Sequence, residues 1–565
     1  MPLQIREESV FCLDFTHQRQ SDSGPYEITI PELVNKKGTN NQTAFVFDSE
    51  RMSFSFEMIK METDYLATGF AATGLKNMDR ILICGHNHSQ VLLSALAASR
   101  AGLVFSLVGA NAVAKPEQLE HLLKAGDFRA VVLFSSPNGG GSDAMYDLIE
   151  SLCPEIKKCA RSKLKSARLP KLTHVILGDE DHKHAGTWTL SEIYGKCTPP
   201  RMEKLPNYLQ WNSHRLACIQ FTLGSTGPPK AAGLSHYQLI NGCRIASNII
   251  GIRKGSIMAC ALPLYRIPVF GLVAFTPFMF ESRTIISEPS PVPRQLITSC
   301  LMHRCTHLVS NSIAIRLLLK MAMAQKVTVP SVETVILLGD RVGRELLANL
   351  EKIMKNAKRI AVGMLLTEVG TAPVISDNTT NLIKSIGKAL QGYEVDIKPI
   401  PKLKNTNGHT IGELRVKALA NTKFIGYGPD FNSNLEWIDT GDIASISKEG
   451  NVEILANKSD LIYDRLDHLV EHWKMEKLMA EEYDEIKGVQ VVQVCPGAPI
   501  VAIIVPKRLD DIPRFFMSEL ISLCNNNKLY PPDKFAVVDD FPRVNTRIQK
   551  FKLREMLKNN MLRTY

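Results

Sequence analysis

The sequence predicts an α/β fold in which parallel sheets are covered by helices, and three observations carry that prediction. Apolar strand-like runs alternate with helix-period segments over roughly the first 400 residues, which is the rhythm of βαβ units. Beyond residue 411 the pattern changes to short strands separated by Gly and Asn turns, typical of antiparallel structure. The chain has 565 residues, and since a single core stops growing near ~250–300 residues, two or three domains are expected.

The first sheet is predicted from an unbroken alternation of strands and helices near the N-terminal end. The predicted strands are Arg80–Cys84, Leu103–Val108 and Ala130–Phe134, and the predicted helices between them are Gln90–Ala101 and Pro116–Ala125.

A second pass of the same rhythm predicts a second sheet. Its predicted strands are Leu216–Phe221, His307–Val309, Thr334–Leu338 and Arg359–Gly363. The two passes together predict one large N-terminal domain that contains two doubly wound sheets.

The antiparallel stretch that follows reads GELRVKAL, KFIGYG and IASISKEGNVEIL, and it predicts a small β-barrel at the end of the large domain. We place a hinge near Ala456–Lys458. The predicted domains are therefore residues 1–456 and a small, mobile α+β domain at residues 457–565. In the small domain we expect a helix at Lys474–Tyr483, strands at Val489–Val494 and Ile500–Val505, and a basic C-terminal helix.

Composition narrows the class of protein and the kinds of partner. Hydrophobic residues make up 45% and charged residues 22% of the chain, which excludes disordered and fibrous classes. The net charge of +10 suits an anionic ligand such as a nucleotide, CoA or a lipid headgroup, but Lys and Arg scattered over a large surface explain it more simply. No run of five like charges occurs, so nucleic acid is not a predicted partner.

The twelve cysteines contain no C-x2-C pair that could form half of a zinc site. The N-terminus carries Glu7, Glu8 and Asp14 and resembles neither a signal peptide nor a mitochondrial presequence. Together these features predict reduced, buried thiols in an intracellular protein. No apolar run reaches the ~20 residues of a membrane span, and the C-terminus is not the peroxisomal tripeptide.

Residues Ile219–Lys230 read IQFTLGSTGPPK, a strand that ends in a loop of glycines and hydroxyls closed by a lysine. Glycines without a Cβ let backbone N–H groups approach phosphate oxygens, and the hydroxyls and lysine add donors and a positive charge. The loop differs from the G-x-x-x-x-G-K-[ST] loop because no Ser or Thr follows Lys230. By its composition alone it would equally be an ordinary turn.

Neighbouring motifs favour the phosphate-binding interpretation. FTLGSTGPPKAAGLSHYQLIN resembles the T-S-G-T-T-G-x-P-K-G loop, and the stretch after it, of the AMP-forming acyl-CoA synthetase (adenylate-forming ligase) superfamily. The resemblance spans nearly the whole chain from Phe47–Phe56, and the C-terminal end is most like the group called acyl-CoA synthetase family member 2, which are medium-chain acyl-CoA ligases. Further matches follow in the family's order: Pro263–Tyr265, Thr367–Glu368, Ser385–Lys388, Gly412–Leu414, Thr440–Asp442 and Ile548–Glu555.

The resemblance implies a two-step reaction. A carboxylic acid, here a medium-chain fatty acid, attacks the α-phosphate of Mg-ATP to give an acyl-adenylate and pyrophosphate, and CoA then displaces AMP. ATP, Mg2+ and CoA are therefore the implied cofactors and cosubstrates. The resemblance also implies which residues hold the β- and γ-phosphates: Thr222, Gly224, Ser225, Thr226, Gly227 and Lys230.

The same resemblance implies that Glu368, next to Thr367, binds Mg2+, and that Asp442 accepts hydrogen bonds from the ribose hydroxyls. Without it, Asp442 would be a β-turn residue before a strand at Ile443–Ile446, and Glu368 a solvated loop carboxylate.

Several positions within or beside the family's motifs carry a different residue in this sequence. Asn457 stands at the hinge where the family has Arg. The other departures are Leu223 for Ser, Ala231 for Gly, Arg266 for His, 364–366 for Tyr-Gly-Thr, and 465–468 for a Gly-Gly-Glu-Asn loop.

The departure with the largest consequence is Arg547, which stands where the family has its catalytic lysine, with Thr546 in place of the preceding glycine. The positive charge is kept, but a planar guanidinium has a different reach from an ammonium group. Arg547, Lys230 and Glu368 are thus the candidate catalytic residues. We expect the nearby Lys550 and Lys552 to be solvated charges on a helix.

Three functions remain open. The chain is a working acid–CoA ligase with altered rate or substrate, or a non-catalytic pseudoenzyme that keeps the fold and binds nucleotide or acyl ligand, or an adenylating enzyme without CoA transfer. The resemblance implies a mitochondrial location. No presequence is visible at the N-terminus, so the cytoplasm is the alternative. Acyl chain length and oligomeric state do not follow from the sequence.

Overall fold

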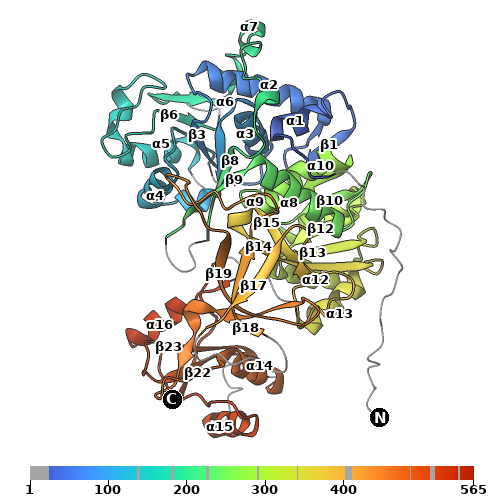
Figure 1. The fold of residues 1–565 in the computed structure, drawn as a ribbon, viewed down its shortest axis with the longest axis vertical. Helices are drawn as coiled ribbons and strands as arrows, with labels where there is room; N and C mark the ends of the chain where they lie inside the picture. Colours follow the sequence, from blue (N-terminus) through green and yellow to red (C-terminus); the bar gives the residue numbers. More distant parts are fainter. Residues whose placement is uncertain are drawn as a thin grey trace. The chain divides into compact units, whose positions relative to one another are not determined.

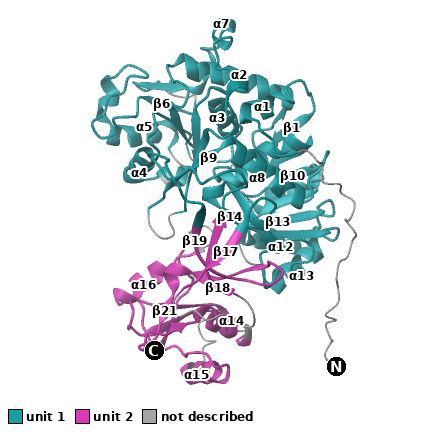
Figure 2. Cartoon of the chain, in the orientation of Figure 1, with its two compact units in different colours: residues 1–394, 417–438 teal, residues 395–416, 439–565 magenta. Residues whose placement is uncertain are grey.

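The computed structural model describes residues 24–565 except 136–139, 180–182, 224–227, 289–291, 340–341, 401–409, 484, 509–515 and 545–546 (Figure 1). The chain divides into two compact units (Figure 2): unit 1 comprises residues 1–394 and 417–438, and unit 2 comprises residues 395–416 and 439–565. The predicted hinge near 456–458 stays a prediction, because compactness does not locate a hinge.

Unit 1 contains a seven-stranded sheet in the order β7-β6-β5-β3-β4-β8-β9, parallel except for β9. The predicted strands at 80–84, 103–108 and 130–134 are confirmed as β3, β4 and β5. The strand bounds are β3 (Arg80–Cys84), β4 (Val104–Val108), β5 (Ala130–Leu133), β6 (His174–Leu177), β7 (Thr187–Thr189), β8 (Leu216–Phe221) and β9 (Ala231–Ser235).

Helices connect the strands of this sheet, and their ends follow local chemistry. Helix α4 (Pro116–Gly126) begins with a proline, whose fixed φ suits the first turn, and ends where Asp127 adopts a left-handed conformation. The side chain of His88 caps α3 (Ser89–Arg100). Strands and helices bury one continuous apolar core that includes Leu82, Leu119 and Val131. The other long helices are α2 (Phe56–Ala72) and α5 (Gly141–Leu152).

The second sheet of unit 1 has nine strands in the order β16-β15-β14-β13-β12-β10-β11-β1-β2. The strands β10 to β14 and β1 are parallel, whereas β2, β15 and β16 run antiparallel to their neighbours. The strand bounds are β1 (Thr43–Phe47), β2 (Met52–Ser55), β10 (Ile257–Cys260), β11 (Arg283–Ile286), β12 (His307–Ser310), β13 (Thr334–Leu338), β14 (Arg359–Leu366), β15 (Thr371–Ile375) and β16 (Lys388–Ala389).

One strand of the predicted second sheet belongs to the first. The run at 216–221 is a strand, β8, as expected, but β8 pairs with β4 and β9 rather than opening the second sheet. The second sheet instead takes β1 and β2 from the N-terminal part of the chain. Sheet membership is decided by long-range pairing, which the order of strands along the chain does not reveal.

Helices α11, α12 and α13 connect the parallel strands of the second sheet, and neighbours among them pack together. Helix α8 packs against β15 and against η4, a π-helical segment at Gly271–Phe275. The helix bounds are α8 (His236–Ile249), α9 (Ile267–Phe270), α11 (Pro293–Met302), α12 (Ser312–Ala324) and α13 (Arg344–Ile353).

The predicted small β-barrel is an open sheet in the described part of the chain. Its order is β17-β18-β19-β20, so the described strands leave two edges. Closing a sheet into a barrel requires the first and last strands to pair. The bounds are β17 (Glu394–Lys398), β18 (Thr410–Lys417), β19 (Trp437–Ile446) and β20 (Val452–Asn457).

The C-terminal part of unit 2 has the predicted α+β composition. A three-stranded sheet, β23-β24-β25, has its own apolar clusters, one with α14 and α15 and one with α16. The bounds are β21 (Ile462–Tyr463), β22 (Leu469–Val470), α14 (His472–Glu482), β23 (Ile486–Gln493), β24 (Ile500–Pro506), α15 (Phe516–Asn526), β25 (Lys534–Val537), β26 (Arg543–Val544), β27 (Arg547–Ile548) and α16 (Lys550–Lys558).

Most cysteines in the described ranges are buried free thiols, as the sequence predicted. Within those ranges no helix combines the length and the apolarity that crossing a bilayer requires.

Candidate active site

The two ends of the predicted phosphate loop are held together by backbone pairing. The loop leaves β8 after Phe221 and re-enters the sheet at Ala231. The Thr222 N–H donates to the Lys230 carbonyl at 3.0 Å, and the Lys230 N–H donates to Thr222 Oγ1 at 3.0 Å. These bonds extend the antiparallel β8–β9 ladder into the loop. Residues Gly224–Gly227, which include Ser225 and Thr226, lie outside the described residues.

The segment Gly426–Gly428 lies along the start of β9. The Gly233 N–H donates to the Gly426 carbonyl at 2.9 Å, and the Gly428 N–H donates to the Ala231 carbonyl at 2.7 Å. A bridge between Ala232 and Tyr427 completes the pairing. This pairing brings Tyr427 beside Lys230, although the two residues are far apart in the sequence.

Tyr427 connects the lysine of the loop to the predicted metal-binding carboxylate. The Lys230 ammonium group lies 4.5 Å from the centre of the Tyr427 ring, a cation–π contact. The Tyr427 hydroxyl donates to Glu368 Oε1 at 2.7 Å. Burial and the neighbouring Glu368 carboxylate raise the pKa of Tyr427, so the hydroxyl stays a donor. Sequence reasoning did not identify Tyr427, because the stretch KFIGYG that contains it was interpreted only as part of an antiparallel β region.

The local fold fixes the position of Glu368. Glu368 lies in a single 3-10 turn, η5 (Thr367–Val369), between β14 and the antiparallel β15, and Glu368 is 8% exposed. Gly370 ends the turn with φ +72°, and a Cβ there would lie 3.0 Å from the Leu234 and Leu239 side chains. The turn therefore requires glycine at this position. The predicted solvated-loop alternative for Glu368 is wrong, because the residue is buried.

Glu368 is a carboxylate of the kind that magnesium takes as a ligand in proteins. No group of three or more His, Cys, Asp or Glu side chains gathers in the described ranges to hold a metal. Magnesium commonly uses one or two carboxylates together with substrate phosphates and waters. The hydroxyl of Tyr427 engages one oxygen of Glu368 and leaves Oε2 outside that bond. No carboxylate of the described residues lies within 4 Å of the Lys230 ammonium group, so it can meet phosphate.

In unit 2, Asp442 contacts Asn457, the predicted hinge residue, on the neighbouring strand. Asp442 lies in β19 directly opposite Asn457 in β20, and Asn457 Nδ2 donates to Asp442 Oδ1 at 3.3 Å. Asp442 is thus within a strand, and the alternative of a turn residue before the strand is wrong. Cross-strand pairing makes this contact.

The residues after β20, at the predicted hinge, also contact the motif at 412–414. The Lys458 ammonium group donates to Glu413 Oε2 at 2.7 Å, and Glu413 is buried. Asn457 Oδ1 accepts the Ser459 N–H at 3.0 Å and so caps the short helix η6 (Lys458–Asp460). Asn457 therefore contacts both Asp442 of β19 and Ser459 of η6.

Arg547 starts β27, which pairs with β26 in a hairpin of two short antiparallel strands; Thr546 lies outside the described residues. The expectation that Lys550 is a solvated charge is wrong. Lys550 is buried, its ammonium group forms an ion pair with Glu476, and it donates to the Val491 carbonyl at 3.1 Å. Lys552 is exposed, as expected.

The loop that replaces the family's Gly-Gly-Glu-Asn is held by a carboxylate rather than by glycine conformations. Asp464 Oδ1 accepts the N–H groups of Leu466 and His468, both at 2.8 Å. These donors lower the pKa of the Asp464 carboxyl. Asp467 has φ +62°, and Leu466 is 76% exposed. The loop thus presents an apolar side chain to solvent where the family has none.

The motif at Pro263–Tyr265 (PLY) is positioned by two amide side chains. Asn87 Oδ1 accepts the Leu264 N–H at 2.7 Å, and Asn87 Nδ2 donates to the Leu262 carbonyl at 3.0 Å. Gln220 Oε1 accepts the Ile267 N–H at 2.9 Å. The backbone around Arg266 is therefore fixed by residues of the seven-stranded sheet and the loop after β3.

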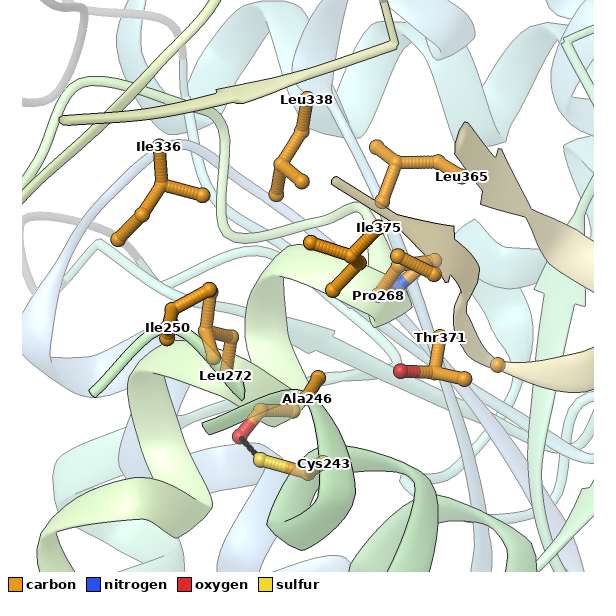
Figure 3. A pocket seen from close by; sticks show the side chains of 13 residues that line it. Cys243, Ala246, Ile250, Pro268, Leu272, Ile336, Leu338, Leu365, Thr371 and Ile375 are labelled. Carbon is orange, nitrogen blue, oxygen red and sulfur yellow. Dashed lines mark hydrogen bonds between the residues drawn. The ribbon is translucent and has the colours of Figure 1, made fainter. Parts of the chain in front are cut away.

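An apolar pocket lies next to the turn that carries Glu368 (Figure 3). It encloses about 10 Å³, room for at most one water molecule. The Cys243 thiol, which lines the pocket, donates to the Gly271 carbonyl at 2.9 Å. Its walls come from α8, α9, η4 and strands β13 to β15, through Cys243, Ala246, Ile250, Pro268, Gly271, Leu272, Ile336, Leu338, Leu365, Gly370, Thr371, Ala372 and Ile375.

A family model described as AMP-binding enzyme matches residues 34–425, more than half of the chain. The protein belongs to the AMP-binding enzyme family. The match includes Lys230 and Glu368 and ends two residues before Tyr427.

Curated relatives match almost the full chain. Medium-chain acyl-CoA ligase ACSF2, mitochondrial, from Homo sapiens is 27% identical over 97% of this chain and 87% of that protein. The protein of the same name from Danio rerio is 26% identical over 91% and 86%. Acyl-CoA ligase sidI of Aspergillus fumigatus is 25% identical over 77% and 74%.

Solved structures confirm the fold. The anthranilate CoA ligase AuaEII in complex with anthranoyl-AMP superposes with a TM-score of 0.76 at 16% identity, over 95% of this chain and 99% of that chain. ATP-bound MatB from Rhodopseudomonas palustris gives 0.76 at 18% identity, over 95% and 100%. The predicted mixed α/β fold with a small C-terminal domain is the fold of these ligases.

Proposed function

We propose that the protein activates a carboxylic acid with Mg-ATP to an acyl-adenylate and pyrophosphate, and then transfers the acyl group to CoA. The observation that carries this proposal is the contact chain from Lys230 through Tyr427 to Glu368. It joins one cation for phosphate to one carboxylate for Mg2+, the two charges that phosphoryl chemistry needs in fixed positions.

The proposed roles of the single residues follow from their chemistry. Thr222, the loop at 224–227 and Lys230 hold the β- and γ-phosphates. Glu368, beside Thr367, binds Mg2+, which neutralises phosphate charge when bound. Asp442 holds the ribose hydroxyls, and its contact with Asn457 orients it.

Arg547 is proposed to neutralise charge between the acid carboxylate and the α-phosphate, as a guanidinium in the place of an ammonium group. We further propose that the small domain begins at residue 457 and moves about Asn457. Asn457 can serve such a role because it ends β20 and caps η6, the point where strand gives way to helix.

The acid is proposed to place its chain in the apolar pocket of Figure 3, because Leu365, Gly370 and Thr371 line that pocket and flank Glu368 in the sequence. A medium chain of methylene groups needs far more than about 10 Å³, so a wall has to move. The segment η4 is the wall suited to this, since π-helical turns occur preferentially at functional sites. Medium-chain ligases among the relatives support this chain length.

A non-catalytic function is the second candidate, and a specific observation favours it. Unit 2 combines Arg547 with a carboxylate-tied loop at 464–468 and a buried, engaged Lys550. Lys550 therefore cannot replace the missing lysine without breaking its pair with Glu476.

The test is pyrophosphate release from Mg-ATP by the purified protein, with acids from two to sixteen carbons, with and without CoA. Acid-dependent release that yields a thioester supports the ligase proposal. Acid-dependent release without thioester supports adenylation without CoA transfer. Absence of release at every chain length contradicts both and leaves the non-catalytic candidate.

A further inference from the structure

The helix pair α11–α12 of unit 1 exposes an unusual combination of apolar and basic side chains. Exposed large apolar residues are normally scattered singly over a surface. Here four of them lie at the C-terminal end of α11 and along α12, with exposures of 41%, 62%, 52% and 40% for Leu301, Met302, Leu317 and Met323. The two helices pack against each other, so these side chains share one region of the surface.

The spacing places the apolar and basic groups on the outer face of each helix. On α12, Arg316 and Leu317, then Lys320, then Met323 recur at helical intervals, whereas Leu318, Leu319 and Ala322 are buried. On α11, Arg294, Thr298 and Leu301 follow the same interval and are exposed. Both helices therefore turn a mixed basic and apolar face outward.

The charge on this surface is one-sided. Between Glu288 and Glu333 the sequence contains no Asp or Glu. All five Lys and Arg residues of that stretch are exposed, and only Arg316 has a carboxylate of a described residue within 4 Å, Glu345 of α13 at 3.8 Å. The other four are Arg294, Arg304, Lys320 and Lys326.

We infer that the α11–α12 surface docks on a bilayer that contains anionic phospholipid. Lys and Arg beside a membrane interact with lipid phosphates while their stems lie along apolar surface. Leu and Met side chains standing among these cations can enter the boundary between headgroups and acyl chains. A folded acidic partner would instead need a matching cavity or knob for each of these separate apolar groups. The inference does not depend on the proposed ligase function, since neither helix carries a residue assigned to acid activation.

The test is co-sedimentation of the full chain with vesicles of phosphatidylcholine alone and of phosphatidylcholine with phosphatidylserine. We expect binding to the anionic vesicles, little binding to the neutral ones, and weakening with salt, because exposed charges are screened beyond a Debye length of ~10 Å at 0.1 M. No binding to anionic vesicles, or equal binding to both kinds, overturns the inference.

Two variants localise the effect. Lys320→Gln with Lys326→Gln should weaken binding to anionic vesicles about 30-fold, since each cation near the surface contributes ~1 kcal/mol. Met302→Gln with Leu317→Gln should weaken binding even at low salt. If electrostatic attraction alone held the protein on the vesicles, this variant would bind like wild type there. These positions are exposed, so folding is expected to persist and is checked by circular dichroism.

A matched control removes the same charge elsewhere on unit 1. Lys163 and Lys165 are exposed and lie outside this surface, so Lys163→Gln with Lys165→Gln should leave vesicle binding unchanged. An equal loss in this control would show a non-specific charge effect and overturn the inference. Tight binding of wild type to poly-glutamate but not to anionic vesicles would indicate an acidic protein partner and overturn it as well. Should the Lys320 and Lys326 double variant misfold, Lys326→Gln alone, at an exposed position beyond the end of α12, tests the same loss of charge.

Discussion

The two units differ in how their candidate site residues are connected. In unit 1 the lysine, the carboxylate and a tyrosine that the sequence did not single out form one contact chain. In unit 2, Asn457 and Arg547 stand where the family pattern has Arg and Lys, and Asn457 donates a hydrogen bond to Asp442. Under the proposed roles, the phosphate and Mg2+ contacts rest on Lys230 and Glu368 of unit 1, whereas the ribose contact of Asp442 and the charge of Arg547 rest on unit 2.

The largest expected effect lies in unit 1. Lys230→Ala should lower acid-dependent pyrophosphate release by about 10²–10³-fold, because a charge that stabilises the developing phosphate charge is lost. The measurement is a coupled pyrophosphate assay at saturating Mg-ATP. Lys204→Ala removes an exposed lysine of the same unit and serves as the control. Equal rates for wild type and Lys230→Ala would remove the lysine from the proposed mechanism.

The opposite effect is expected in unit 2. Arg547→Lys combined with Thr546→Gly should raise acyl-adenylate formation on the order of 100-fold, because an ammonium group restores the reach that a planar guanidinium lacks. Arg508→Lys, an exposed substitution of the same kind in the same unit, should change nothing. A folded double variant that forms no acyl-adenylate and no thioester would contradict the proposed ligase function.

A smaller effect tests the bridge between the two charges of unit 1. Tyr427→Phe keeps the ring under Lys230 and removes the hydroxyl that donates to Glu368. Hydrogen bonds to charged groups contribute about 1.5–3 kcal/mol, so the KM for Mg-ATP should rise about tenfold or more. Raising the Mg2+ concentration should recover part of the loss, which a purely structural role of the hydroxyl would not allow. An unchanged Mg2+ dependence would separate Tyr427 from metal binding.

The smallest effect compares the acid sensitivity of the two units. Burial lowers the pKa of His236 to about 3 and of His307 to about 4 in unit 1, and that of His472 far below its usual range in unit 2. The neutral forms of these histidines are favoured in the folded state. The stability that the protein has with neutral histidines is therefore intact above the unfolded pKa of ~6.5 and is lost as the pH falls below it.

Each of these histidines should therefore cost about 1.4 kcal/mol per pH unit between pH 6.5 and its folded pKa. His472→Phe should remove one such cost from unit 2 alone. The measurement is amide hydrogen exchange at pH 7 and pH 5, in which the change in α14 of unit 2 is compared with the change in α12 of unit 1. Identical acid sensitivity of α14 in wild type and in His472→Phe would show that His472 does not control it.

Local structure was largely predictable from the sequence, whereas long-range partners were not. The strands β3, β8 and β13 begin and end at the predicted residues, because each is a buried apolar run bounded by turn residues. The sheet to which β8 belongs was predicted wrongly, since pairing with β4 is a contact between distant segments.

The candidate site shows the same limit. The motifs identified Lys230 and Glu368, but Tyr427 enters the site only through pairing between residues 426–428 and β9. Lys550 was predicted to be solvated because helical periodicity alone does not show that its face packs over Glu476 and β23. A basic residue in a polar helix gives no sign of burial until the partner carboxylate is located.

The most direct test of the central claim is a calorimetric titration of the full chain with ATP, in Mg2+ and in EDTA, for wild type and Glu368→Gln. We predict that wild type binds ATP more tightly in Mg2+ than in EDTA and that Glu368→Gln loses this difference while Lys230 still holds the phosphates. Wild type that binds no ATP, or a Glu368→Gln variant with an unchanged Mg2+ dependence, would contradict the account.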